Sequence, residues 1–286
     1  MKLPAAILTI ALLPSLHRAE PQQPDIKPDI VYGHKMGMAL TFDVLTPKSG
    51  ANGAGILFMV SGGWVSMWVP PEQLLGGLGK GLGFPALLEK GFTLFIVRHG
   101  SSPLFRVPDC IADVRLAVRF IRSHAANYGV DPARLGVFGA SAGGHLSLML
   151  GTTGEDSGHL AAVVAIFPPT ELKSYLESDK MRTQFPALQF DAATWKAVSP
   201  LEHVTADDTP SLLLHGDKDT LVPDKHSREI LQAFKDKNVP AELLMFPGAG
   251  HGFNKDQQAK AVSATVAWFE KYLAKPAVPD AAAPPK

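Results

Sequence analysis

The sequence lacks features that mark several classes of protein. It has one cysteine, Cys110, in 286 residues, which excludes an intrachain disulfide and a cysteine-rich metal site. We interpret Cys110 as a buried small hydrophobic residue. Lys plus Arg equals Asp plus Glu, at 27 each, so net charge provides no basis for binding nucleic acid or an anionic membrane. The hydrophobic content of 46% is typical of a globular protein with a sizeable core.

The two ends of the chain differ in composition from the rest. An apolar run from Leu3 to Leu13 follows Lys2 and is too short to cross a bilayer. This pattern is typical of a signal peptide, so we predict that residues 1–19 are removed and that the protein is secreted or periplasmic. Residues 20–31 are rich in proline and are predicted to form a spacer. Residues 275–286 are mostly Ala and Pro and are predicted to be disordered.

Residues 32–274 alternate between continuous apolar runs and helical patterns. Runs such as 55–60 are apolar throughout, as expected of strands buried on both faces. Strands that alternate with helices indicate an α/β fold, with a mostly parallel twisted sheet and helices on both faces. Residues 168–210 interrupt the alternation, and we interpret them as a small lid insertion, with an ordinary surface excursion as the alternative. The predicted strands are 38–45, 55–60, 92–97, 135–138, 161–167, 211–215 and 241–246, and the predicted helices include 84–90, 108–125, 224–237 and 257–273.

A Gly-x-Ser-x-Gly motif follows the apolar run 135–138. It comprises Gly139, Ser141 and Gly143. In a nucleophile elbow, the serine occupies a strained turn between a strand and a helix, so its neighbours must be small. The motif therefore predicts that Ser141 is a nucleophile at the start of a helix.

A serine nucleophile needs a base and a carboxylate that orients the base. Asp217 and Asp219 both follow the strand 211–215, and we favour Asp219 because Asp217 is better placed to hydrogen-bond backbone within its turn. His251 follows the last strand between glycines and is the predicted base. His226, in a charged helical stretch, is predicted to lie on a solvated helix face. The remaining histidines near the motifs, His145 and His215, are predicted to support the site or to pack beside it.

The predicted oxyanion hole combines two segments. One backbone N–H donor is expected from Ala142, which follows the serine, and the other from Gly62 or Gly63, in the loop after the strand 55–60. A plain tight turn is the alternative for these glycines. The side chains of Trp64, Met67 and Trp68 are predicted to bind substrate as the lining of an acyl pocket.

Together these motifs resemble the α/β-hydrolase superfamily, in its esterase/lipase branch close to prolyl-oligopeptidase-like catalytic domains. The resemblance spans residues 32–273 and implies a triad of Ser141, Asp219 and His251. Related esterases usually carry His-Gly-Gly-Gly-Trp after the first buried strand, whereas this chain has Val60-Ser61-Gly-Gly-Trp64. That departure bears on how the loop is supported and on its acceptance of bulky or tertiary esters.

We therefore predict a serine hydrolase that cleaves carboxylic esters through an acyl-enzyme. Its partner is a small-molecule ester, and we expect no metal, cofactor, nucleic acid or membrane partner. One alternative is a serine exopeptidase or oligopeptidase, since the same triad cleaves amides. A second is a binding protein that keeps the fold without the chemistry. The sequence leaves the particular ester and the oligomeric state open.

Overall fold

A computed structural model describes residues 23–154 and 160–275 of the chain. The predicted signal peptide, residues 1–19, and the predicted disordered tail beyond residue 275 lie outside the described residues. Within the described part, no helix is long and apolar enough to cross a membrane. The same residues hold no group of three or more His, Cys, Asp or Glu side chains arranged to bind a metal ion.

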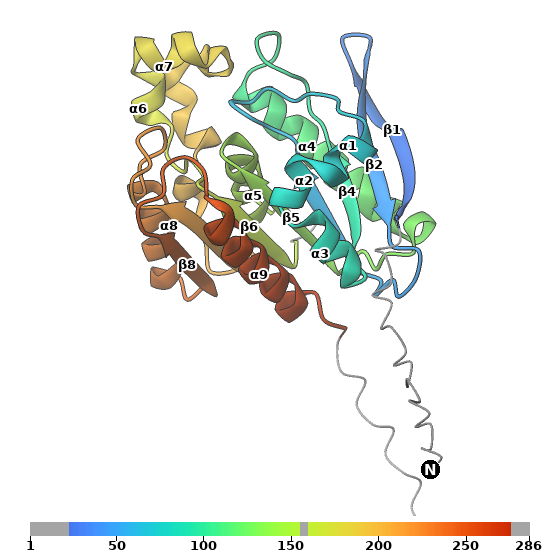
Figure 1. The fold of residues 1–286 in the computed structure, drawn as a ribbon. Helices are drawn as coiled ribbons and strands as arrows, with labels where there is room; N and C mark the ends of the chain where they lie inside the picture. The colour runs from blue at the N-terminus through green and yellow to red at the C-terminus, as the bar shows by residue number, and fades with distance from the viewer. Residues whose placement is uncertain (1–22, 155–159, 276–286) are drawn as a thin grey trace, which may run out of the picture.

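One eight-stranded sheet organises the described residues, with strand order β1-β2-β4-β3-β5-β6-β7-β8 (Figure 1). β2 is antiparallel to both β1 and β4, and every neighbouring pair from β4 to β8 is parallel. The strands are β1 (Asp25–Lys35), β2 (Met38–Thr46), β3 (Gly55–Met59), β4 (Thr93–Val97), β5 (Leu135–Ala140), β6 (Ala162–Ile166), β7 (Ser211–Gly216) and β8 (Ala241–Phe246). The predicted α/β class with a mostly parallel sheet is confirmed.

Helices cover both faces of this sheet. Side chains of a strand alternate between faces, and on β3 Leu57 and Met59 pack in one core while Ile56 and Phe58 pack in the other. Side chains of α4, α5 and α8 complete the first core, and those of α1, α3 and α9 complete the second. The α-helices are α1 (Pro71–Gly76), α2 (Leu78–Gly81), α3 (Phe84–Glu89), α4 (Val107–Ser123), α5 (Ala142–Thr152), α6 (Lys173–Leu176), α7 (Asp179–Gln184), α8 (Lys225–Asp236) and α9 (Lys255–Tyr272); the 3₁₀ helices are η1 (Ala125–Tyr128), η2 (Pro186–Leu188), η3 (Ala192–Val198) and η4 (Pro200–His203).

The single cysteine of the chain lies in the first core. Cys110 lies on α4 and is fully buried, as predicted. Burial raises the pKa of its thiol, and the nearby Asp113 carboxylate raises it further. A thiol that stays protonated is a poor nucleophile, so Cys110 contributes to packing.

The N-terminal spacer prediction is wrong for part of its length. Residues from Asp25 onward form the edge strand β1, whose pairing with β2 is irregular between Lys27 and Ile30, where Pro28 lies. Proline lacks an N–H donor, but an edge strand tolerates it, particularly beside a bulge. The strand predicted at 38–45 is β2, and it lies inside the sheet, between β1 and β4.

The segment between β6 and β7 is helical. It contains α6, α7 and the 3₁₀ helices η2, η3 and η4, and α6 and α7 stand at the upper left in Figure 1. Leu172, Leu176, Ala187, Leu188 and Val198 of this segment are buried in the first core. The predicted insertion is therefore folded onto the domain.

Candidate active site

Ser141 lies on a sharp turn between β5 and α5. Its backbone angles are φ 55° and ψ −120°, in the region that side-chain-bearing residues rarely occupy. A Cβ atom at Gly139 would lie 2.5 Å from the backbone of Gly143, and one at Gly143 would lie 2.6 Å from the Met59 carbonyl oxygen. The two glycines therefore allow the strand and the helix to approach closely enough for this turn. The structure has the strained strand–turn–helix geometry that the motif predicts.

Three predicted side chains meet at the carboxyl edge of the parallel strands. The Nε2 atom of His251 lies 2.9 Å from the Ser141 hydroxyl, and its Nδ1 lies 2.7 Å from Oδ2 of Asp219. His251 follows β8, Ser141 follows β5 and Asp219 follows β7. A carboxylate accepts hydrogen bonds and cannot donate them, so Nδ1 of His251 carries the hydrogen. Its Nε2 is therefore free to accept a hydrogen bond from the serine hydroxyl.

Asp219 is held in place by several donors. Its Oδ1 accepts the N–H groups of Leu221 and Val222 at 3.0 and 2.9 Å, which leaves Oδ2 for His251. Burial acts to raise the pKa of Asp219, but hydrogen bonds from His215 and His251 and from the Val222 N–H outweigh it and lower the pKa below its usual range. The side chain is therefore a stable anion beside the imidazole.

Asp217, the alternative acid, lies in the same loop with a different partner. Its Oδ1 accepts the N–H of Gly248 at 2.6 Å, which joins the turns after β7 and β8. The two candidate carboxylates thus have different hydrogen-bond partners in the structure. Asp219 contacts the imidazole, and Asp217 supports the loop that carries it.

The two other histidines near the motifs, His145 and His215, are buried. His215 contacts Ser227 Oγ and the Val222 carbonyl, while His145 Nδ1 accepts from the Trp64 indole and its Nε2 donates to the Val198 carbonyl. Both occupy the supporting positions expected of them. Burial lowers the pKa of His145 to about 4, which keeps its ring neutral.

The prediction of a solvated His226 is wrong. Its side chain is 1% exposed and stacks on Tyr175 of α6, with a ring-centroid separation of 5.5 Å. Thr170 and Tyr175 contact its two ring nitrogens. The segment between β6 and β7 covers this face of α8, which the charged sequence around His226 does not reveal.

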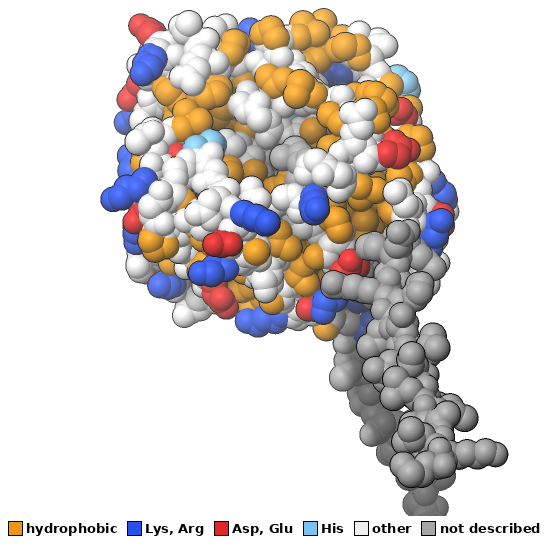
Figure 2. Space-filling model, viewed as in Figure 1, with side chains coloured by type: hydrophobic (Ala, Val, Ile, Leu, Met, Phe, Trp, Pro, Cys, Tyr) orange, Lys and Arg blue, Asp and Glu red, His pale blue; other side chains and the backbone are white. Residues whose placement is uncertain are grey.

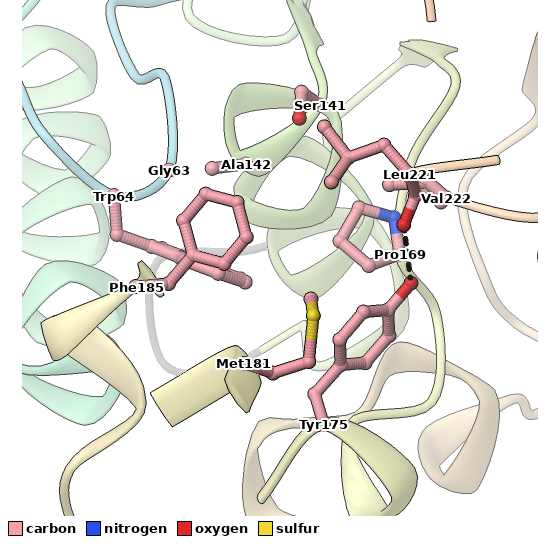
Figure 3. Close-up of a pocket in the computed structure, with 10 residues that line it drawn as sticks. All are labelled: Gly63, Trp64, Ser141, Ala142, Pro169, Tyr175, Met181, Phe185, Leu221 and Val222. Atoms are coloured by element: carbon pink, nitrogen blue, oxygen red, sulfur yellow. Dashed lines mark hydrogen bonds between the residues drawn. The ribbon is translucent and has the colours of Figure 1, made fainter. Parts of the chain in front are cut away.

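In the loop after β3, the backbone hydrogen bonds of the two glycines predicted to line the oxyanion hole differ. The Gly62 N–H donates to the Val65 carbonyl at 3.0 Å, and Val65 N–H returns a bond to the Gly62 carbonyl. Within the described residues no hydrogen bond engages the N–H of Gly63 or of Ala142. Gly63 and Ala142 both line the pocket that contains Ser141 (Figure 3). Gly62 is thus committed to a turn, and Gly63 and Ala142 are left as the candidate donors.

An apolar pocket opens beside Ser141. Its empty volume is about 310 Å³, including space open to solvent. Figure 3 shows Trp64 and Phe185 on one side, Met181 and Tyr175 at the bottom, and the turn after β7 on the other side. It is lined by Gly63, Trp64, Ser141, Ala142, Pro169, Tyr175, Met181, Phe185, Leu221 and Val222.

Several of these lining residues were not anticipated from the sequence. Tyr175, Met181 and Phe185 come from the segment between β6 and β7, and only its apolar residues without helical periodicity signalled such a role. Trp64 is buried in the pocket wall as predicted, but Met67 and Trp68 do not line this pocket. They are 65% and 55% exposed.

The Trp68 indole has a partner outside the pocket, since it donates to Asp29 on the edge strand β1. Figure 2 shows hydrophobic side chains gathered over the upper part of the molecule, where Figure 1 places the lid helices and the tip of the β1–β2 hairpin. Exposed apolar residues are thus a general feature of this end.

The sheet order, the strained serine turn and the positions of His251 and Asp219 after later strands define an α/β-hydrolase fold. The profile of the BD-FAE family matches residues 42–234, about two thirds of the chain, so this chain belongs to that family. A second profile, described as TAP-like protein, matches residues 188–284.

Curated relatives include esterases. A probable carboxylic ester hydrolase of Mycobacterium tuberculosis, LipM, is 29% identical over 275 residues, which cover 86% of this chain and 60% of LipM. The acylamino-acid-releasing enzyme of Arabidopsis thaliana is 30% identical over 182 residues, covering 58% of this chain and 22% of that enzyme. The chain spans 44% to 60% of the length of the three mycobacterial esterases that it matches.

A solved esterase has the same fold over nearly its whole length. Thermogutta terrifontis esterase 2, phosphoramylated by tabun, has a TM-score of 0.71 and 25% identity, covering 91% of this chain and 99% of that one. The propionate-bound structure of the same esterase has a TM-score of 0.67 and 26% identity, covering 90% and 98%. The similarity thus extends over the whole described domain.

Proposed function

We propose that this protein is a serine esterase that hydrolyses small carboxylic esters through an acyl-enzyme. The observation that carries the proposal is the continuous hydrogen-bonded series from Asp219 through His251 to the Ser141 hydroxyl, at 2.7 and 2.9 Å. A serine hydroxyl is a weak nucleophile, and this arrangement supplies the base that activates it. The family and the esterases among its relatives support the same chemistry.

The proposed mechanism has two acyl-transfer steps. Ser141 Oγ attacks the ester carbonyl carbon while His251 Nε2 takes its proton, and the alkoxide then leaves with that proton. Water next attacks the acyl-enzyme, again giving a proton to His251, and Ser141 recovers its hydrogen as the carboxylic acid departs. Asp219 remains ionised throughout and stabilises the imidazolium that forms in each step.

The negative charge that develops on the carbonyl oxygen needs donors that are already in place. We assign this role to the backbone N–H groups of Gly63 and Ala142, which border the pocket on the side of the serine. The N–H of Ala142 is the first of α5, whose N-terminus also favours negative charge. No metal or other cofactor takes part in this mechanism.

The lining of the pocket favours an apolar acyl group. Trp64, Met181 and Phe185 present hydrophobic surface beside Ser141, and Phe185 approaches Gly63 closely. We propose that the acyl group of the ester occupies this pocket and that the alcohol part lies toward His251 and solvent. A short acyl chain suits a pocket closed by three large side chains, and a related esterase binds propionate.

A panel of substrates tests this proposal directly. The wild-type protein is expected to hydrolyse nitrophenyl acetate, propionate and butyrate, with kcat/KM falling for octanoate and longer chains. An acylated peptide amide belongs in the same panel, because an acylamino-acid-releasing enzyme is among the relatives and the same triad cleaves amides. A faster rate on the amide than on every ester would show that the protein is a peptidase.

Phe185→Ala is expected to change the preference for acyl length. Removing the ring extends the pocket, so the ratio of kcat/KM for octanoate to that for butyrate should rise roughly tenfold. Phe190→Ala is the matched control, because Phe190 is a half-buried phenylalanine of the same lid segment that does not line the pocket. An unchanged ratio in Phe185→Ala, with wild-type folding by circular dichroism, would show that acyl groups bind elsewhere.

A further inference from the structure

The loop that carries Gly63 is tied to the neighbouring loop after β4. The N–H of Val60 donates to the Val97 carbonyl, and the N–H of Ser102 donates to the Trp64 carbonyl. The N–H of Ser66 donates to Ser101 Oγ, and the N–H of His99 donates to Ser66 Oγ. These bonds hold the two loops together along their length. The side chains of Ser61 and His99 add a further link near the glycines.

The His99 ring is buried and oriented by backbone. Its Nδ1 lies 2.8 Å from the Gly100 carbonyl oxygen and its Nε2 lies 2.9 Å from Ser61 Oγ, with the residue 4% exposed. A carbonyl oxygen only accepts, so Nδ1 donates to it and Nε2 is left to accept the Ser61 hydroxyl hydrogen. Burial lowers the pKa of His99, which favours this neutral ring.

The support for His99 extends to a partly buried ion pair. The Gly100 N–H donates to Asp113 Oδ2 at 2.9 Å, and Asp113 Oδ1 accepts from Lys35 Nζ at 2.8 Å. Asp113 lies on α4 and Lys35 ends β1, so two different elements fix the position of Gly100. The imidazole therefore has little freedom to follow Ser61 if that residue moves.

Ser61 also contacts the helix that follows the nucleophile. Its carbonyl accepts the N–H of Gly143 at 3.3 Å, in the first turn of α5, next to the candidate donor Ala142. Ser61 is thus bonded through its side chain to the β4 loop and through its backbone to α5. It lies two residues before Gly63, the other candidate donor. A fixed Ser61 sets the distance between the two segments that would hold the oxyanion.

We propose that the Ser61–His99 pair positions the Gly63 N–H for the oxyanion, with His99 acting only through Ser61. The inference rests on the proposed function. Neither residue touches the reacting atoms, so both are positioning residues.

The test compares variants of Ser61 in the full-length protein. Ser61→Ala and Ser61→Gly are expected to lower kcat for nitrophenyl butyrate by roughly 10- to 100-fold, with KM changed by less than about threefold, since oxyanion donors act mainly in the transition state. Affinity for a trifluoromethyl ketone, which forms a tetrahedral adduct, should fall in parallel with kcat/KM. Ser61→Thr keeps the hydroxyl and should restore most of the activity.

His99→Gln and Tyr32→Phe complete the comparison. His99→Gln should resemble Ser61→Ala, and the double variant should lose no more than either single one, because both break the same bond. Tyr32→Phe removes a buried hydrogen bond to the Arg98 carbonyl, one residue before His99, and should keep wild-type kcat. Thermal unfolding of every variant separates a loss of folding from a loss of rate.

The outcomes separate this inference from the proposed function. If the wild type hydrolyses the ester, Ser141→Ala does not, and folded Ser61→Ala retains wild-type kcat, the positioning role is overturned while the esterase proposal stands. Equal losses in Ser61→Thr and Ser61→Ala would also overturn it, because the hydroxyl would then be irrelevant. A wild type that hydrolyses no ester in the panel would overturn both proposals.

Discussion

Ser141→Ala is expected to lower kcat/KM for nitrophenyl butyrate by roughly 10⁴- to 10⁶-fold, the loss expected on removal of a triad nucleophile. The hydroxyl is the only group at this turn that can form the acyl-enzyme, and its hydrogen bond to His251 is lost with it. Initial rates at several substrate concentrations measure the effect. A fluorophosphonate probe should label the wild type and leave the variant unlabelled.

The control for this prediction is Ser211→Ala. Ser211 is buried and its hydroxyl donates to the Thr209 carbonyl, but it begins β7 at the edge of the sheet away from the site. It should keep wild-type kcat and labelling. Hydrolysis by Ser141→Ala at the wild-type rate would mean that another group is the nucleophile and that the proposed mechanism is wrong.

Asp219→Asn is expected to lower kcat by roughly 10³- to 10⁴-fold. The carboxylate accepts from two backbone N–H groups through Oδ1 and from His251 through Oδ2. An amide that keeps its oxygen on the backbone donors presents NH₂ to His251, so Nδ1 must become the acceptor. Nε2 then carries the hydrogen and cannot take a proton from Ser141.

Asp217→Asn provides the contrast within the same loop. Its amide oxygen can still accept the Gly248 N–H, so kcat should stay within roughly twofold of the wild type. Steady-state kinetics of the two asparagine variants, measured side by side, decide between the carboxylates. A larger loss at residue 217 would reverse their assignment.

Much of the fold could be predicted because its strands are buried on both faces. Such strands have continuous apolar runs, as in β3 and β4, and these runs can be recognised in the sequence without any tertiary information. The edge strand β1 pairs on only one side, so its sequence tolerates a proline, Pro28, and many polar residues, and it indicated a spacer instead. Edge positions relax the very constraints that make a strand recognisable.

Some residues of the candidate site could likewise be predicted from the sequence, and others could not. Ser141, Asp219 and His251 could be predicted because each follows a recognisable strand, and parallel strands end at one edge of the sheet. The lid residues Met181 and Phe185 could not, because no local pattern relates them to a serine some 40 positions earlier in the chain. Their place depends on how the segment between β6 and β7 folds back onto the domain.

The sequence by itself determined the α/β class, the strained serine turn and the chain order of the candidate nucleophile, acid and base, since these follow from local sterics and hydrophobic patterning. Only the tertiary structure shows that Asp219, and not Asp217, contacts the His251 imidazole, and that the Gly62 N–H, unlike that of Gly63, is bonded within a turn. It also buried His226 and joined Ser61 to His99. These choices depend on which hydrogen-bond partner lies within about 3 Å across the loops. Such distances are set by packing between segments that are remote in the chain.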